Sequence, residues 1–118
     1  MFWKRFLGIF GEDEAAKLLK QRGYKIIQRN YSCKYGEIDI IAKDGKTLVF
    51  IEVKTLSKGK GETPFDAITE RKRRHIGNCA EYYLHDKKMK EIEIRFDAVA
   101  VWYEGKENTK IEVVKGAF

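Results

Sequence analysis

Three acidic residues and one lysine are spaced along two neighbouring segments so that they could lie together. Glu37 and Asp39 are two residues apart, and so are Glu52 and Lys54. Each pair lies in an apolar segment that predicts a β-strand, at 35–42 and 47–54. Side chains two residues apart in a strand share a face. The pattern therefore predicts carboxylates and an ammonium group on one surface, which could bind a hard divalent cation and a phosphate.

The sequence Asp44-Gly45 between these strands predicts a hairpin with a two-residue type I′ turn. With that turn, Glu37 lies opposite Glu52, and Asp39 is a diagonal neighbour of Glu52 at roughly 7–8 Å. One predicted face is wholly apolar and consists of Ile38, Ile40, Ala42, Val49, Ile51 and Val53. The other is apolar only near the turn, at Ile41, Leu48 and Phe50. Both faces must therefore be covered, and the charged end is partly buried.

Like charges in a partly buried position are costly, because burial removes their hydration. A divalent cation between Asp39 and Glu52 would offset that cost. Oxygen ligands without a nearby His or Cys favour Mg²⁺ or Mn²⁺ over zinc, and Glu37 is a rival ligand to Asp39. The alternative is an exposed strand end with Glu–Lys pairs worth at most about 1 kcal/mol.

The two strand segments carry a resemblance. Gly36-Glu37-Ile38-Asp39 and Phe50-Ile51-Glu52-Val53-Lys54 resemble the PD-(D/E)xK nuclease signature. Over about residues 8–102 the chain resembles the YraN family of bacterial proteins, which are predicted endonucleases with a restriction-endonuclease-like fold, similar to archaeal Holliday junction resolvases. The other matching motifs are Gly11-Glu12 with Ala15, Gly23-Tyr24, Arg29-Asn30, Arg71-Lys72 and Arg95-Phe96-Asp97. The family commonly has Lys-Gln where this chain has Lys72-Arg73.

The resemblance implies a metal-dependent DNA endonuclease that hydrolyses phosphodiester bonds, with branched or damaged DNA as a candidate substrate. In that reading Asp39 and Glu52 hold one or two Mg²⁺, the Val53 carbonyl is a further ligand, and Lys54 positions the attacking water. The resemblance also favours Asp39 over Glu37 as the metal ligand. Resolvase-like action needs two active sites on one junction, so it would require a homodimer.

Two further polar residues lie on predicted apolar helix faces. Glu12 shares a face with Ala15, Ala16 and Leu19 and could reach the carboxylates, as the first-helix acid does in similar resolvases. Its alternative role is to favour the helix dipole. Lys72 lies on the stripe of Ile68 and Ile76, where it could contact phosphate or water in the site. Its alternative is a lysine that extends its ammonium group into solvent.

A basic surface is the candidate DNA contact. It combines Arg71, Arg73 and Arg74 with Lys58 and Lys60 of the preceding loop. The net charge of +6, from 24 Lys and Arg against 18 Asp and Glu, also favours a polyanionic partner. The alternative is an ordinary solvated face. If the surface binds DNA, its contacts would be mainly to phosphates.

The 118 residues predict one α/β domain in which helices flank a mixed sheet, in the order α-β-β-β-α-β-β. The predicted segments are a helix at 11–22, strands at 24–31, 35–42 and 47–54, a helix at 64–84, and strands at 92–103 and 110–114. Residues 1–10 predict a short helical extension that packs on the body or on a second copy, with membrane-surface contact the weaker alternative. No segment is long enough to span a bilayer.

Other residues favour structural roles. Asp97 is expected to anchor a loop or pair with a base rather than bind metal, and His75 and His85 are expected on the surface. Cys33 and Cys79 favour reduced thiols in the cytoplasm.

Two other functional classes compete with the nuclease hypothesis. One is a non-catalytic nucleic-acid-binding module with the same fold, and the other is a structural protein with an incidental acidic cluster.

Overall fold

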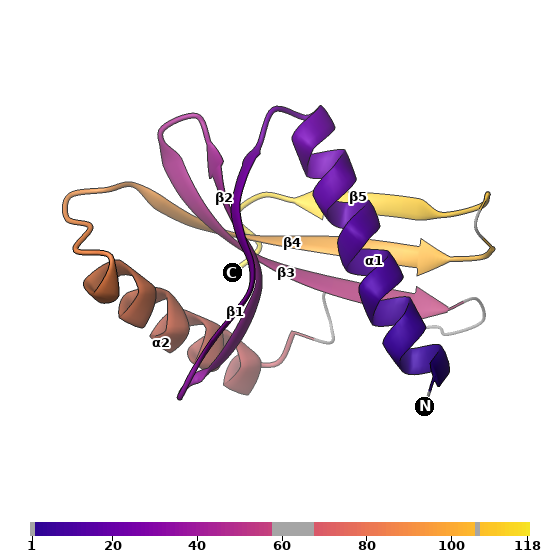
Figure 1. Cartoon of the computed structure of the whole chain (residues 1–118), viewed down its shortest axis with the longest axis horizontal. Helices are drawn as coiled ribbons and strands as arrows, with labels where there is room; N and C mark the ends of the chain where they lie inside the picture. The colour runs from indigo at the N-terminus through magenta and orange to yellow at the C-terminus, as the bar shows by residue number, and fades with distance from the viewer. Residues whose placement is uncertain (1, 58–67, 106) are drawn as a thin grey trace.

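The computed structural model describes residues 2–57, 68–105 and 107–118 (Figure 1). It confirms the predicted element order. The two helices and five strands are α1 (Phe2–Gln21), β1 (Lys25–Cys33), β2 (Gly36–Asp44), β3 (Thr47–Ser57), α2 (Glu70–Asp86), β4 (Ile94–Tyr103) and β5 (Lys110–Val114). The strands form one sheet in the order β1-β2-β3-β4-β5.

The sheet is mixed, as expected. β1, β2 and β3 pair antiparallel, β3 and β4 pair parallel, and β4 and β5 pair antiparallel. A parallel pair needs a crossover, and α2 lies in the connection between β3 and β4. α1 crosses the sheet in front of β3, β4 and β5, whereas α2 lies near the lower ends of β1 and β2 (Figure 1).

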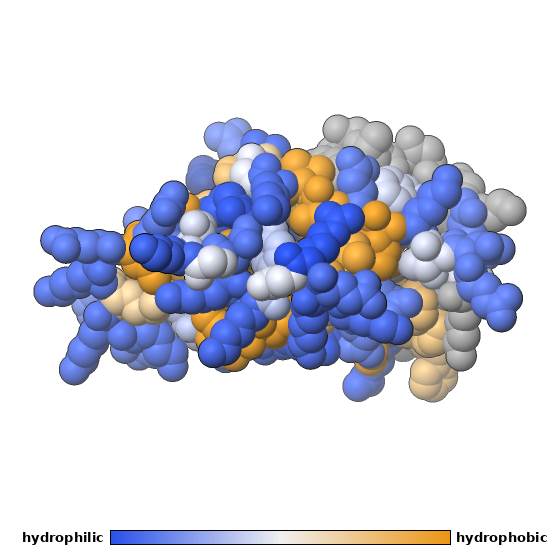
Figure 2. All heavy atoms as spheres, turned by 90° about the horizontal axis from the view of Figure 1, so that it is seen from above, coloured by the Kyte–Doolittle hydropathy of each residue, from blue (hydrophilic) through white to orange (hydrophobic). Residues whose placement is uncertain are grey.

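Two apolar clusters cover the two faces of the sheet. The α1 side contains Ala15, Ala16, Leu19, Tyr24, Ile40, Ala42, Val49, Ile51, Val99 and Val101. The α2 side contains Tyr31, Ile38, Ile41, Leu48, Phe50, Ile76, Cys79, Ala80 and Tyr83. β3 contributes to both clusters, which explains its nearly continuous apolar sequence. The face of the molecule that Figure 2 shows is mainly hydrophilic, with separate hydrophobic patches.

α1 is one continuous helix of 20 residues, where the sequence predicted an extension at 1–10 and a separate helix at 11–22. It ends where predicted, before Gly23, whose φ of 92° suits glycine. Its first turns are held by aromatic contacts. The rings of Trp3, Phe6 and Phe10 each lie within 5.8 Å of the Tyr103 ring, centroid to centroid. The expected extension therefore packs on the body, at the end of β4.

α1 and β3 approach closely at Gly11. A Cβ atom built on Gly11 would overlap the side chain of Thr55, whereas one built on Gly8 meets nothing within 4 Å. Gly11 is buried and directly precedes Glu12, a predicted site residue. The absence of a side chain at Gly11 therefore determines how near α1 brings Glu12 to β3.

The predicted hairpin register was wrong by two residues. Asp44 pairs with Thr47 and Ile41 with Phe50, so the turn residues are Gly45 and Lys46 rather than Asp44 and Gly45. Of the turn residues only Gly45 has a positive φ, 63°, which suits a type II′ turn. Asp44 is therefore the last residue of β2 and not a turn residue. Its carboxylate binds Arg95, 2.8 Å away, and Lys115, 3.2 Å away.

A second correction concerns Ile38, which packs in the α2-side cluster rather than beside Ile40. Across the ladder, its partner Tyr31 also faces α2, whereas Arg29, the partner of Ile40, reaches α1. Asn30 separates these two β1 residues and has a φ of 54°. This left-handed conformation interrupts the alternation of β1 beside the part of β2 where Ile38 departs from its predicted face.

Asp97 anchors the end of the sheet near the hairpin turn, which confirms its predicted structural role. It is fully buried. Its carboxylate accepts hydrogen bonds from the Tyr24 hydroxyl, the Arg95 guanidinium and the Gly116 N–H, at 2.8–3.0 Å. The charge is thus fully compensated by hydrogen-bond donors.

α2 begins with a Thr69 cap, whose hydroxyl accepts from the Lys72 N–H at 3.1 Å. The predicted stripe is confirmed at Ile76, Cys79, Ala80 and Tyr83, whereas the predicted start at Pro64 and Phe65 lies outside the described residues.

The Cys33 and Cys79 thiols are free and in contact, with the sulfurs 2.9 Å apart. Neither described helix is long and apolar enough to cross a membrane.

Two glycines of α1 allow a matched stability test. Gly8→Ala should stabilise the protein by roughly 0.5–1 kcal/mol, because alanine favours the helix and its methyl group has free space. Gly11→Ala should destabilise it by about 1–3 kcal/mol through overlap with Thr55. Urea unfolding measures both changes. Stabilisation by both substitutions would contradict the close approach of α1 to β3.

Removal of the Asp97 charge tests the anchor. Asp97→Asn should cost about 3–5 kcal/mol, because it leaves Arg95 without its buried partner. Asp13→Asn is the control, since Asp13 is 57% exposed in its pair with Arg29 and its loss should cost at most about 1 kcal/mol. Chemical denaturation of both variants gives the comparison. Equal effects would show that the Asp97 network contributes little.

Candidate active site where β2 separates from β3

The candidate site begins where β2 separates from β3. The last paired residues of this ladder are Ile40 and Ile51. One step further, where the register would bring Asp39 opposite Glu52, the side chain of Asp39 turns to the β3 backbone. Its Oδ2 atom accepts a hydrogen bond from the Val53 N–H at 2.7 Å. The two acids are therefore cross-strand neighbours, not the diagonal pair that the sequence predicted.

Glu52 is the more buried acid, with 7% of its surface exposed. Its Oε1 atom lies 3.4 Å from the Lys72 ammonium, so α2 reaches the site as predicted. Burial raises the pKa of Glu52 and the nearby Asp39 carboxylate raises it further, whereas Lys72 lowers it. Burial likewise raises the pKa of Asp39, while the Val53 N–H opposes that rise. The half-exposed Lys72 thus does not fully compensate the two acids.

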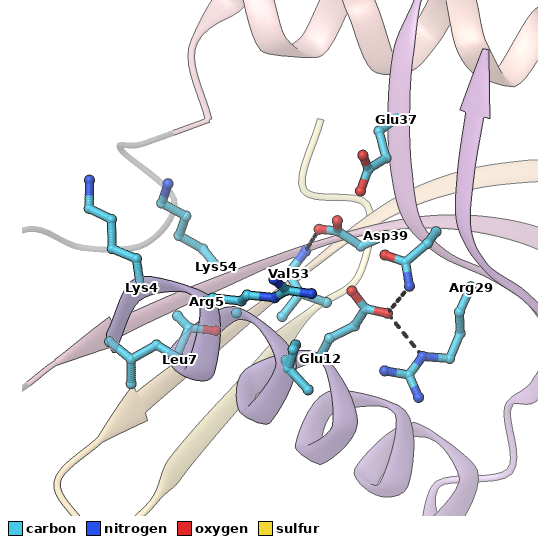
Figure 3. A pocket seen from close by; sticks show the side chains of 13 residues that line it. Lys4, Arg5, Leu7, Glu12, Arg29, Glu37, Asp39, Val53 and Lys54 are labelled. Carbon is cyan, nitrogen blue, oxygen red and sulfur yellow. Dashed lines mark hydrogen bonds and ion pairs between the residues drawn. The ribbon is translucent and has the colours of Figure 1, made fainter. Parts of the chain in front are cut away.

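Glu12 faces the same place from α1, which confirms the inward position predicted for it. Its Oε1 atom accepts from Arg29 Nε at 2.9 Å and from Asn30 Nδ2 at 3.0 Å (Figure 3). Its charge contributes to the raised pKa of Asp39. Sequence reasoning assigned no role to Arg29 and Asn30. Both can reach one carboxylate because the left-handed conformation of Asn30 turns adjacent side chains to the same side.

A cavity of about 650 Å³ opens beside these groups. Glu12, Glu37 and Asp39 lie on one part of its wall, and Asp39 points to the Val53 backbone (Figure 3). The remaining lining residues are Lys4, Arg5, Leu7, Gly8, Ile9, Arg29, Asn30, Val53, Lys54 and Thr55. Acidic and basic side chains therefore face a common space that three strands and α1 enclose.

The two predicted lysines occupy different places. Lys54 lines the cavity, but its side chain extends away from Asp39 (Figure 3). Lys72 lies against Glu52 instead. Glu37 lines the cavity as an exposed residue that the structure places near Asp39, where its charge contributes to the raised pKa of Asp39.

The predicted DNA contacts are only partly described. Arg71, Arg73 and Arg74 are exposed on α2 and do not line the cavity. Lys58 and Lys60 lie outside the described residues. His75 and His85 are exposed, as expected.

The donor atoms of the site suit Mg²⁺ or Mn²⁺. In the described ranges, no three His, Cys, Asp or Glu side chains already form a metal-binding group. Mg²⁺ characteristically takes one or two carboxylates and completes its shell with water and substrate phosphates. Asp39, which lines the open cavity, and the neighbouring Glu52, which Lys72 compensates only in part, fit that requirement.

The fold and site define a mixed α/β protein with a buried acid, Glu52, next to a half-buried acid, Asp39, where two strands separate. Comparison with known proteins is more specific. Residues 11–101 match the profile of the uncharacterised protein family UPF0102, and the chain belongs to this family. A UPF0102 protein of Caldicellulosiruptor saccharolyticus is 47% identical over 98% of both chains. One from Moorella thermoacetica is 45% identical over 98% of this chain and 97% of its own. The expected YraN family is thus confirmed.

Substitution of Glu52 tests its uncompensated charge. A carboxyl group with a raised pKa binds its proton more tightly in the folded protein, so the wild type loses stability as pH rises above about 4.5. Glu52→Gln should remove this loss. In a chelator at pH 8, we expect its melting temperature to exceed that of the wild type by at least about 3 °C, with a smaller difference at pH 4.

Glu81→Gln is the control for this measurement, because Glu81 is exposed on α2. Its melting temperature should follow that of the wild type at both pH values. A Glu52→Gln variant that behaves like Glu81→Gln would show that the site acids are compensated without a cation.

Proposed function

We propose that this protein is a Mg²⁺- or Mn²⁺-dependent endonuclease that hydrolyses DNA phosphodiester bonds. The observation that supports it most directly is the pair of neighbouring acids Asp39 and Glu52, both with raised pKa values, of which Asp39 lines a cavity with basic residues on its wall. Among the described residues, Asp44 and Asp97 instead each bind the Arg95 guanidinium. Incompletely neutralised acids next to a cavity are characteristic of functional sites.

Asp39 and Glu52 would hold the metal, with the Val53 carbonyl as a candidate further ligand. When bound, the cation would stabilise negative charge on a phosphate and make a bound water more acidic. It would also offset the repulsion between the two acids.

The remaining residues would position these groups. The Val53 N–H restricts the orientation of the Asp39 carboxylate, and Arg29 and Asn30 restrict that of Glu12. Lys72, 3.4 Å from Glu52, would move between this carboxylate and a substrate phosphate once a cation is present. Lys54 would act from the cavity wall on water or phosphate.

Cleavage of DNA by matched variants tests the proposal. Supercoiled, linear and branched DNA are incubated with Mg²⁺ or Mn²⁺, and products are separated on gels. Asp39→Asn and Glu52→Gln should each lower the rate at least about 100-fold, a loss of about 2.7 kcal/mol of transition-state stabilisation. Asp13→Asn removes an exposed acid of α1 and should cleave at the wild-type rate.

Lys54→Ala and Lys72→Ala separate the two candidate lysines, since the one that contacts the reacting phosphate should lose more rate. DNA binding without cleavage by the wild type, in both metals and on every substrate, would contradict the hydrolase. That result would favour the non-catalytic binding module. Cleavage that persists in Asp39→Asn would also contradict the proposed site.

A further inference from the structure

Lys4 and Arg5 place two cations on the wall of the cavity that contains Asp39. They come from the first turns of α1, before residue 11, where the family match begins. None of the roles proposed above uses them. Their position relative to the acids therefore calls for an explanation.

The aromatic contacts hold this end of α1 against the sheet. Trp3 and Phe6 flank Lys4 and Arg5 in sequence, and both rings pack on Tyr103 of β4. Leu7, the next residue in the cavity wall, is 8% exposed. The two cations thus lie on a docked helix, so the backbone that carries them is already ordered before they bind a ligand.

Both cations are available for an anion. In the ranges that the structure describes, neither lies within 4.0 Å of a carboxylate in an ion pair, whereas Arg29 is paired with Glu12 and Asp13. The Arg5 guanidinium turns into the cavity towards Val53, and Lys4 extends on the same side as Lys54 (Figure 3). A cluster of cations opposite a group of acids suits a phosphate chain whose scissile bond lies at the acids.

The geometry of α1 sets the distance between the cations and the acids. Arg5 and Glu12 are seven residues apart, which corresponds to roughly 10 Å along the axis of α1. Successive phosphates of one DNA strand lie about 3.4 Å apart along the duplex axis and further apart along the strand itself, so this distance exceeds the spacing of neighbouring phosphates only modestly. Cations this far from the acids would contact a flanking phosphate rather than the scissile one.

We propose that Lys4 and Arg5 bind backbone phosphates of a DNA strand that flank the scissile phosphate, as positioning residues. The strand would follow the α1 wall past Gly8, where no side chain narrows the cavity. The scissile position in this inference rests on the proposed function, whereas the phosphate contact can be measured without cleavage.

Fluorescence anisotropy with labelled DNA in a chelator tests the phosphate contact. The Lys4→Ala/Arg5→Ala double variant should lose at least about 10-fold in affinity at 0.1 M salt. The slope of log affinity against log salt should decrease by about 1.8, which is 0.9 for each of two lost phosphate contacts. Lys17→Ala/Lys20→Ala, at exposed positions of the same helix, removes equal charge and should change both quantities less.

Gly8 provides a test that adds a side chain instead of removing charge. A Cβ at Gly8 meets nothing within 4 Å, so Gly8→Leu should fold with a melting temperature no lower than the wild type. Its side chain would occupy the proposed strand path and should lower affinity at least 10-fold. Gly8→Ala should bind nearly as the wild type does.

Kinetics separate positioning from catalysis. Arg5→Ala should raise KM several-fold with little change in kcat, and Arg5→Lys should recover most of the loss. Equal binding by the Lys4/Arg5 and Lys17/Lys20 double variants, or unchanged binding by Gly8→Leu, would overturn the inference. DNA binding that depends on Lys4 and Arg5 without any cleavage would leave the phosphate contact supported and contradict the hydrolase alone.

Discussion

The separation of β2 from β3 after Ile40 and Ile51 is the constraint on which the site depends. A strand that loses its neighbour leaves backbone donors unpaired, and a buried unpaired N–H costs about 1–3 kcal/mol. Asp39 removes this cost at Val53 by accepting its N–H. One structural requirement thus places a carboxylate next to Glu52, at the edge of the cavity that the separation opens. The orientation of Asp39 follows from backbone hydrogen bonding and needs no ligand.

Acids at the two ends of the β2–β3 hairpin are compensated to different degrees. Near the turn, the hydrogen bonds that Arg95 and Lys115 donate lower the pKa of Asp44. At the other end, burial raises the pKa values of Asp39 and Glu52, and Lys72 does not reverse that shift. A lysine that is half exposed is a weak counter-ion, whereas a guanidinium that binds two carboxylates is a strong one. The incompletely compensated acids thus destabilise the fold at the end of the hairpin that borders the cavity.

Much of this arrangement could be predicted from the sequence because strand alternation has a period of two. The register error was also two residues, so it left the parity of the strands unchanged, and Asp39 and Glu52 remained neighbours although their predicted pairing changed. The error arose at Asp44, which an ion pair with Arg95, 51 residues away, draws into the strand. No local pattern encodes such a contact. The position of Ile38 was missed because the prediction used only the alternation of its own hairpin, whereas the neighbouring strand β1 is irregular at Asn30.

Helix periodicity left the roles of Glu12 and Lys72 open, because each residue had an ordinary structural alternative. Only the packing of α1 and α2 on the sheet brings them to Asp39 and Glu52. For α1 this packing depends on Gly11, since a side chain there would push the helix away from Thr55. The same helix carries Glu12 one residue after this contact and Arg5 two turns before it, so the Gly11–Thr55 contact determines the position of both relative to β3. Glu12 and the proposed phosphate-binding residue Arg5 are therefore parts of one rigid helix.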